Sequence, residues 1–465
     1  MAIFNTNENC ITATSSVLLL FMTSLIPYQQ QLHHFTAEAG GVRACIDYNQ
    51  IENTITITCN ASFLGVVQAI NDPAILEELE NDEYLLKANL QVVDGVTFAM
   101  SSYGDNLQYL KITGANGIIV EGKILINGVK ITSWDVSDDD VVQQDMNGSI
   151  SRGYIQFASS EGAQILNSEF GYLGDVEPGR RGFDLFGGGG PSHDMEIRGS
   201  KFHDMWMAFY SNGAYNIVVD GNEYYNNIKY ALDPHTGTYN MNITNNWLHH
   251  NPIGAICSDD CYNILIEGNV AHDNTNAGIF FSRNMTNSIA RNNHVYNTNT
   301  GILVSESPNN QIYDNTIEGA MEEGILLLNP DIPDDGLAED NHVYNNTISD
   351  SENGIRLTRS QDNILENITF SDIESSEYLL SGNSSIIIRG QDFDDALIAE
   401  EGSATDNLVE IVDSGTIEVT EVANDVGDGG DDDDDEEEGE ENSYNTDNEP
   451  YRKRLSDGDS IIVNS

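Results

Sequence analysis

A phenol, a carboxylate and an imidazole occur within the six residues Tyr230-Ala-Leu-Asp-Pro-His235. All three groups can hold and release protons, and histidine and tyrosine serve as general acids and bases. Pro234 biases Asp233 towards an extended conformation and removes one backbone donor. Because alternate residues of a strand face the same side, we expect Asp233 and His235 to project together. A strand end in which Asp-Pro opens a turn and His235 caps it would explain the same residues structurally.

Further polar residues lie at intervals of about 24 positions before and after this hexapeptide. Asp259 follows His235 by 24 residues, and Arg283 follows Asp259 by another 24. Tyr210 precedes Asp233 by 23 residues. In stacked coils such residues lie roughly 4.8 Å apart per layer. The spacing therefore predicts that they line one groove, with the Tyr210 ring able to stack above the site as an aromatic platform.

The element that positions these residues is a repeat of short strands, each followed by asparagine. Spacings of 24, 23, 24 and 22 residues separate Asn222, Asn246, Asn269, Asn293 and Asn315. Short apolar and β-branched runs between Gly and Asn turns indicate strands, since no 3.6-residue period is sustained. Asparagines at one position of each coil can stack as an amide ladder. This predicts an all-β fold, a right-handed parallel β-helix with coils of about 22–24 residues. Leucine-rich repeats share this length, but their Leu framework and helical segment are not visible in the sequence.

The hexapeptide resembles the Y-G-F-D-P-H motif of the mannuronan C5-epimerases, with Ala231 where the family has glycine. The sequences GAICSDDC at residues 254–261 and GIFFSR at residues 278–283 resemble the next two coils of that family. The likeness extends over residues 112–370 and is strongest over residues 202–305. It implies a right-handed parallel β-helix that inverts C5 of uronate residues in a polysaccharide.

The resemblance also implies roles for individual residues. Tyr230 and His235 would be the acid/base pair, and Asp233 and Asp259 would shape the site around the substrate carboxylate. Asp259 and Asp260 stand where the periplasmic branch of the family carries a basic residue, so the chain is more similar here to the secreted, calcium-using branch. Ca²⁺ is the one cofactor that this likeness suggests, and the sequence identifies no metal ligands.

The reaction of this family requires a positive charge beside the substrate carboxylate. The C5 proton of a uronate is too weak an acid to remove unless the charge of the adjacent carboxylate is neutralised. Arg283 is the first candidate for the neutralising cation, and Lys229 is the second. A base then removes the proton from one face and an acid returns one from the opposite face. The sequence does not assign these two roles between His235 and Tyr230.

Longer gaps in the repeat predict insertions, among them residues 133–155 and 171–195. Insertions in solenoids cluster on one face and often frame a groove. The second insertion contains Arg180 and Arg181, the densest basic pair before the C-terminal tail. We expect this pair either to bind an anionic polymer or to lie in a solvated loop.

Composition limits the partners of the chain. With 76 acidic and 19 basic residues its net charge is −57, which argues against binding nucleic acid or anionic membranes. An anionic polysaccharide substrate would need salt screening, bound cations or a local basic patch. Cys45 and Cys59 could form a disulfide in an oxidising compartment, whereas Cys257 and Cys261 are expected to pack against a turn. A monomer is expected.

The sequence divides into four regions. Residues 1–39 hold the apolar run VLLLFMTSLI and a small-residue site, AEA, which predict export and a secreted or cell-surface protein. Residues 40–100 are predicted to cap the first coil, with a short helix in AILEELEND at residues 74–82. The catalytic β-helix is predicted over residues 101–420. Residues 421–465, with eight consecutive acids at residues 431–438, are predicted to be a disordered acidic tail.

Three other functions are compatible with the same residues. A polysaccharide lyase abstracts the same C5 proton and then eliminates the C4 oxygen. An inverting glycosidase of the pectin type would use Asp259 and Asp260 about 6.5–9.5 Å apart, but its G-H-G and R-I-K partners are missing. A non-catalytic carbohydrate-binding surface solenoid would keep its function after replacement of His235 by alanine.

Overall fold

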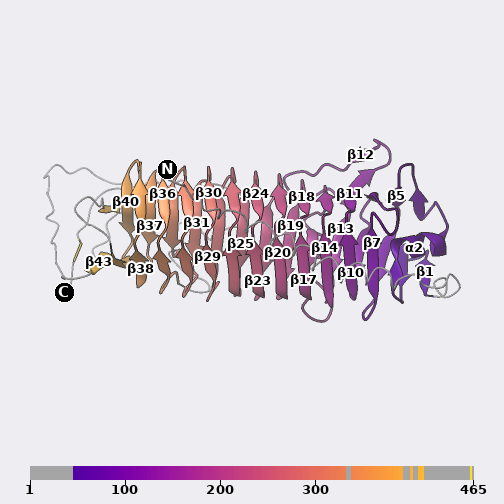
Figure 1. Ribbon diagram of the computed structural model, residues 1–465, viewed down its shortest axis with the longest axis horizontal. Helices are drawn as coiled ribbons and strands as arrows, with labels where there is room; N and C mark the ends of the chain where they lie inside the picture. The colour runs from indigo at the N-terminus through magenta and orange to yellow at the C-terminus, as the bar shows by residue number, and fades with distance from the viewer. Residues whose placement is uncertain (1–44, 331–336, 391–397, 402–406, 413–460, 463–465) are drawn as a thin grey trace, which may run out of the picture.

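The computed structural model describes residues 45–330, 337–390, 398–401, 407–412 and 461–462. They form an elongated right-handed solenoid of about 13 coils, each of about 24 residues, stacked along the long axis of the molecule (Figure 1). The predicted all-β fold, a right-handed parallel β-helix, is confirmed. Within this part of the chain, no helix has the length and apolar character that crossing a membrane requires.

Three sheets run along the solenoid, and their strands pair in parallel except in β1–β2, β4–β5 and β11–β12. In order, sheet A contains β1 (Ile46–Asn49), β2 (Thr54–Ile57), β6 (Asn89–Val92), β9 (Gly117–Val120), β13 (Tyr154–Phe157), β16 (Gly182–Leu185), β19 (Met207–Asn212), β22 (Tyr230–His235), β25 (Ile253–Ser258), β28 (Ala277–Ser282), β31 (Thr300–Ser305), β34 (Glu323–Leu328), β37 (Asn353–Thr358), β40 (Ser376–Ser381) and β42 (Ile398–Glu401).

Sheets B and C complete each coil. Sheet B contains β3 (Ala61–Ser62), β7 (Thr97–Ser101), β10 (Lys123–Asn127), β14 (Gly162–Leu166), β17 (His193–Arg198), β20 (Tyr215–Asp220), β23 (Tyr239–Thr244), β26 (Tyr262–Glu267), β29 (Ile289–Arg291), β32 (Gln311–Tyr313), β35 (His342–Tyr344), β38 (Asn363–Glu366), β41 (Ser385–Arg389), β43 (Asn407–Val412) and β44 (Ile461–Ile462). Sheet C contains β4 (Leu76–Glu78), β5 (Glu83–Leu86), β8 (Tyr109–Thr113), β11 (Lys130–Asp135), β15 (Glu169–Gly171), β18 (Lys201–His203), β21 (Glu223–Tyr225), β24 (Trp247–His249), β27 (Val270–His272), β30 (His294–Tyr296), β33 (Thr316–Glu318), β36 (Thr347–Ser349) and β39 (Thr369–Ser371), with β12 (Asp140–Val141) paired to β11.

Inward-facing side chains of the three sheets fill the interior. One fully buried row in sheet A, paired in register from coil to coil, consists of Leu232, Ala255, Ile279, Ile302 and Ile325. Because successive residues of a strand face opposite sides, the residue after each member of this row points outward. The core row therefore fixes which residues of β22 reach the outer face of sheet A, and Asp233 is one of them.

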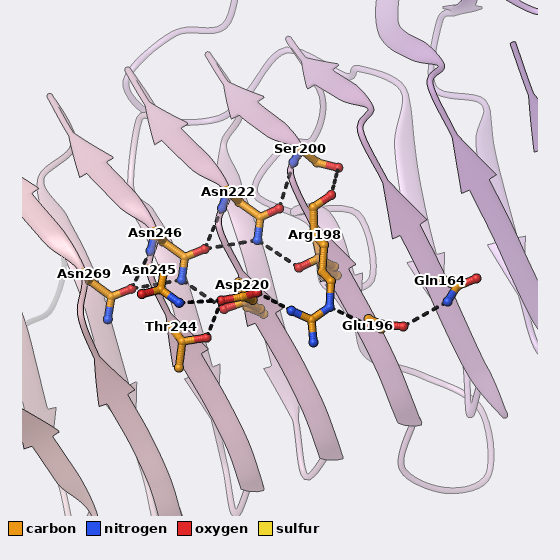
Figure 2. Close-up of polar contacts among 12 residues, drawn as sticks. Gln164, Glu196, Arg198, Ser200, Asp220, Asn222, Thr244, Asn245, Asn246 and Asn269 are labelled. Atoms are coloured by element: carbon orange, nitrogen blue, oxygen red, sulfur yellow. Dashed lines mark hydrogen bonds and ion pairs between the residues drawn. The ribbon is translucent and has the colours of Figure 1, made fainter. Parts of the chain in front are cut away.

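An asparagine ladder joins the coils at the turn after sheet B. Asn246 Oδ1 accepts hydrogen bonds from the backbone N and the Nδ2 of Asn222, at 3.0 and 3.1 Å (Figure 2). Asn269 accepts the same pair of bonds from Asn246, and the pattern continues through Asn293 to Asn315. The predicted amide ladder is confirmed, and it satisfies buried backbone groups that would otherwise be costly.

Replacing Asn246 by alanine is expected to destabilise the solenoid by about 1–3 kcal/mol, because it removes the acceptor of two Asn222 donors and the donor to Val219 O. Asn242→Ala is the matched control, since Asn242 is exposed on the outer face of β23 and is not among the residues with a left-handed backbone. The control is expected to change stability by about 0.5 kcal/mol or less. Chemical denaturation followed by circular dichroism gives both values, and equal effects would count against the ladder as a stabilising device.

The N-terminal region differs from the prediction in two ways. Residues 74–82 contain no helix, because β4 pairs antiparallel with β5 and buries Leu76. The helix is instead α2 (Phe63–Ile70), capped by Ser62, whose side chain accepts from Gly65 N. Parallel pairing already begins between β2 and β6, so the predicted boundary between residues 40–100 and 101–420 falls inside the β-helix. Short runs are marginal helices alone, and hairpin pairing overrode the local preference.

The four described cysteines form one disulfide and two free, buried thiols, as the sequence predicted. Cys45 and Cys59 form a disulfide with Cα atoms 5.7 Å apart. Cys257 and Cys261 are free and buried, and Cys261 Sγ lies 3.3 Å from Ser258 O, so their predicted packing against a turn is confirmed. The predicted export segment lies outside the described residues, and so does the predicted acidic tail apart from β44.

Candidate active site

The outer face of sheet A carries the candidate site at β22. Asp233 pairs in register with Tyr210 of β19, and His235 pairs with Asn212 of β19 and with Ser258 of β25. Both side chains share the neighbours Arg181, Asp259 and Arg283, whose charges act on each of them. Asp233 and His235 therefore lie on one side of the strand, as their spacing predicted.

A chain of polar contacts runs from His235 towards the next two coils. His235 Nε2 lies 3.4 Å from Asp259 Oδ2, and Arg283 Nε lies 2.9 Å from Asp259 Oδ1. Asp259 and Arg283 are the first residues after β25 and β28, and both have left-handed backbones, with φ of 59° and 48°. Because Ser258 and Ser282 pair in register, the two side chains leave the solenoid at the same corner. The 24-residue spacing thus predicted a real contact.

Aromatic and basic groups lie on the other side of His235. The Tyr210 ring centroid is 5.4 Å from that of His235, and the Arg181 guanidinium lies 4.1 Å from the Tyr210 centroid. Arg181 Nη1 is 3.4 Å from Asp184 Oδ2. The Tyr210 ring is buried and covered by Arg181, so its place in the structure is that of a spacer between Arg181 and His235 rather than an open platform.

Burial has the largest effect on the pKa values of Asp184, Asp233 and His235. Loss of solvent raises the pKa of Asp233 well above its usual value, although the charges of Arg181 and Arg283 oppose the shift. Burial also raises the pKa of Asp184, to about 6, against the effect of Arg181. The pKa of His235 is lowered, first by burial and further by Arg283 and Arg181, while Asp259 opposes the change. Burial thus favours the uncharged form of both groups, the neutral imidazole of His235 and the neutral carboxyl of Asp233.

Tyr230 lies at the start of β22, five residues or about 16 Å of strand from His235. It packs against a small apolar cluster on the outer face of sheet A, formed by Ile253, Ile256, Ala277, Phe280 and Leu303. Tyr230 and His235 are both half-buried on this face. Tyr230 and His235 therefore stand at the two ends of β22 on this face, on either side of Asp233 along the strand.

Two other predicted basic residues, Lys229 and Arg180, contact aromatic rings. Lys229 Nζ lies 5.4 Å from the ring centroid of Trp206. Arg180 pairs with Asp175 and lies over the Tyr154 ring. Of the two adjacent arginines, the structure brings only Arg181 against Tyr210, because it directly precedes β16.

Sequence reasoning missed two residues that shape this region. Asp184 stands in register with Tyr210, but the insertion before β16 interrupts the repeat that would have indicated it. Arg152, 1% exposed, donates hydrogen bonds to the carbonyls of Leu173, Gly174 and Asp204. It thereby fixes the start of the segment that leads to Arg181. No periodic signal marked Arg152, whose partners are all backbone atoms.

Metal ligands do not cluster in the described ranges: no group of three or more His, Cys, Asp or Glu side chains is arranged there to hold an ion.

Sequence comparison relates the chain to polysaccharide-modifying enzymes. It is 25% identical to a mannuronan C5-epimerase of Pseudomonas putida over 265 residues, which are 54% of this chain and 50% of that protein. It is also 25% identical to a mannuronan C5-epimerase of Pseudomonas aeruginosa over 231 residues, 48% of this chain and 42% of that protein. The chain thus spans about half the length of the curated relatives it matches. The resemblance predicted from the hexapeptide is confirmed at this level.

Solved structures and a family description agree on the fold. The crystal structure of the periplasmic alginate epimerase AlgG matches with a TM-score of 0.56 and 19% identity, covering 77% of this chain and 85% of that one. At this identity the match shows a shared fold. The family described as "Right handed beta helix region" matches residues 181–332 and 292–422. Since these matches span more than half of its 465 residues, the chain belongs to the right-handed β-helix family.

Proposed function

We propose that the protein is a polyuronate C5-epimerase that acts on a mannuronan- or alginate-like polysaccharide. The observation that carries the proposal is the contact chain His235–Asp259–Arg283 beside the buried carboxyl of Asp233, whose pKa burial raises. It places an imidazole, a buried carboxyl group and a guanidinium on one face. The relatives named mannuronan C5-epimerase support the choice of substrate class.

The proposed reaction uses each group once. Arg283 binds the carboxylate of the reacting uronate beside the buried carboxyl of Asp233, so that the negative charge that develops there is stabilised. The neutral imidazole of His235 takes the C5 proton, and Asp259 stabilises the imidazolium that forms. Tyr230, on the other side of the sugar, donates its hydroxyl proton to the opposite face of C5. The configuration is inverted, and exchange with water returns both groups to their starting states.

Proton NMR in deuterated water tests this proposal. Purified protein is incubated with polymannuronate and with a panel of other polyuronates. We expect deuterium at C5 together with inverted configuration at that carbon. An unsaturated product that absorbs in the near ultraviolet would identify a lyase instead. Failure of every polyuronate to exchange C5 hydrogen would reject the proposed function.

The pH profile provides an independent prediction. The base must be neutral to act, and the pKa of His235 in the folded protein lies below its ordinary value of about 6.5. The rate is therefore expected to persist through pH 6.5 and to fall only at lower pH, where the imidazole protonates. Asp259→Asn removes the charge that supports the imidazolium, so its acid limb is expected at still lower pH. Measurement of kcat/KM against pH reports these groups in the free enzyme. An acid limb above pH 6.5 would contradict the assignment of His235.

We also propose that the protein acts outside the cytoplasm. The Cys45–Cys59 disulfide supports this location, because such bonds persist in oxidising compartments. The likeness to a periplasmic epimerase points the same way.

A further inference from the structure

A column of stacked aromatic rings runs along the corner where the strands of sheet B begin. The first residues of β17, β20, β23 and β26 are His193, Tyr215, Tyr239 and Tyr262, and their successive ring centroids lie 5.0, 5.1 and 4.8 Å apart. The column ends at Tyr262, because the next coil carries Thr286 at this register. One face of the Tyr262 ring is therefore not covered by another ring of the described residues, and Tyr262 is 42% exposed.

An exposed amide follows each tyrosine of this column. Asn216, Asn240 and Asn263 have left-handed backbones, with φ of 57°, 52° and 55°, and each donates through Nδ2 to the side chain one coil before it. In the next coil Asn287 donates instead to its neighbour Thr286. The exposed ladder therefore ends beside the last ring, and among the described residues nothing donates to Asn263 Oδ1. This oxygen is available to a ligand.

A pocket of about 350 Å³ opens on sheet B where the column and the ladder end. This volume lies within the range of about 300–1,000 Å³ that is typical of small-ligand sites. The pocket is lined by the amides of Asn240, Asn242, Asn263 and Asn287 and by the half-buried apolar side chains of Leu265 and Ile289. Because Tyr239 covers one face of the Tyr262 ring, the other face is directed towards the coil that carries Asn287 and Ile289.

The chemistry of this pocket fits the hydroxyl groups of a sugar better than a carboxylate. Arg291, at the far end of β29, also lines the pocket, but its charge is neutralised by Glu267 at 3.0 Å and its Nη1 donates to the Tyr313 hydroxyl. The other polar groups are amides, and an amide both donates and accepts hydrogen bonds, as a sugar hydroxyl does. The C–H face of a pyranose packs on apolar side chains and on the partially negative face of an aromatic ring.

We propose that this pocket is a second polysaccharide site, which binds 1→4-linked mannopyranose units through their hydroxyl groups and does not require their carboxylates. The choice of mannopyranose rests on the function proposed above, whereas the pocket is separate from the reaction on sheet A. Tyr262 stacks on one sugar, and the amides of Asn263 and Asn287 bind its hydroxyl groups. Because β23 and β26 directly follow β22 and β25 along the chain, a polymer held here has a raised local concentration at the candidate active site.

Calorimetric titration with β-1,4-linked mannohexaose, the uncharged counterpart of hexamannuronate, tests this site. We expect saturable binding to the wild type and an affinity lower by about fivefold or more in Tyr262→Ala. Tyr215→Ala is the matched control and should bind as the wild type does, because His193 and Tyr239 cover both faces of the Tyr215 ring outside the pocket. If Tyr262→Ala does not fold, Asn263→Gly removes the amide and keeps the left-handed backbone, with Asn216→Gly as its control.

Three results would overturn the second site: no saturable binding of mannohexaose by the wild type, an equal loss of affinity in Tyr262→Ala and Tyr215→Ala, or binding of hexamannuronate alone. C5 exchange on polymannuronate is measured separately and distinguishes this inference from the proposed reaction. Mannohexaose binding that depends on Tyr262, without any exchange, would keep the site and reject the epimerase. Exchange without mannohexaose binding would keep the epimerase and reject the site.

Discussion

Replacing His235 by alanine is expected to lower C5 proton exchange by about 10³-fold or more while binding of the polymer is largely retained. The reason is geometric, because no other histidine contacts Asp259 among the described side chains. Removal of the imidazole takes away the base and leaves Asp259 and Arg283 paired with each other. Deuterium incorporation measured by NMR gives the rate, and calorimetry gives the affinity.

His342→Gln is the matched control for this variant. His342 also pairs with a carboxylate, Glu366 at 3.1 Å, but it lies on sheet B. Its exchange rate should equal that of the wild type. Retention of wild-type turnover in His235→Ala would mean that the site on sheet A is not catalytic, and a non-catalytic carbohydrate-binding solenoid would then be the better description.

Periodicity in the sequence was sufficient to predict most of the fold. In a solenoid each coil repeats the hydrogen-bonding pattern of the one before, so a buried asparagine such as Asn246 must recur at the same place in the next coil. The same logic placed Asp259 and Arg283 near His235. The 24-residue spacing was one residue too long, because the register partner of His235 is Ser258 and Asp259 is the next residue. The left-handed turn brings the Asp259 side chain back to the imidazole.

What could not be predicted depends on contacts that break the period. The residues 172–181 precede β16 with no counterpart in later coils, so nothing in the spacing separated Arg181 from Arg180 or indicated Asp184. The contact of Arg181 with the Tyr210 ring could not be predicted for the same reason. At the N-terminus, the hairpin of β4 and β5 replaces the predicted helix because pairing with a neighbouring strand outweighs the preference of a short segment.

Replacing Arg283 by glutamine is expected to lower kcat by about 10²–10³-fold, with a smaller change in KM. Proton abstraction at C5 spreads negative charge onto the uronate carboxylate, so a guanidinium that contacts this group stabilises the transition state more than the bound substrate. Steady-state kinetics of C5 exchange separates the two parameters. Arg291→Gln is the matched control, since Arg291 is ion-paired to Glu267 at 3.0 Å on sheet B and should be dispensable for turnover.

The contact chain also predicts how the activity loss in Arg283→Gln combines with the activity loss in Asp259→Asn. Asp259 joins Arg283 to His235, so Asp259→Asn releases the guanidinium as well as weakening the imidazolium. The double variant is therefore expected to lose much less than the product of the two single losses, because both substitutions disrupt one connected unit. Fully multiplicative losses would mean that Asp259 and Arg283 act independently, and a loss confined to KM would make Arg283 a binding residue that does not stabilise the transition state.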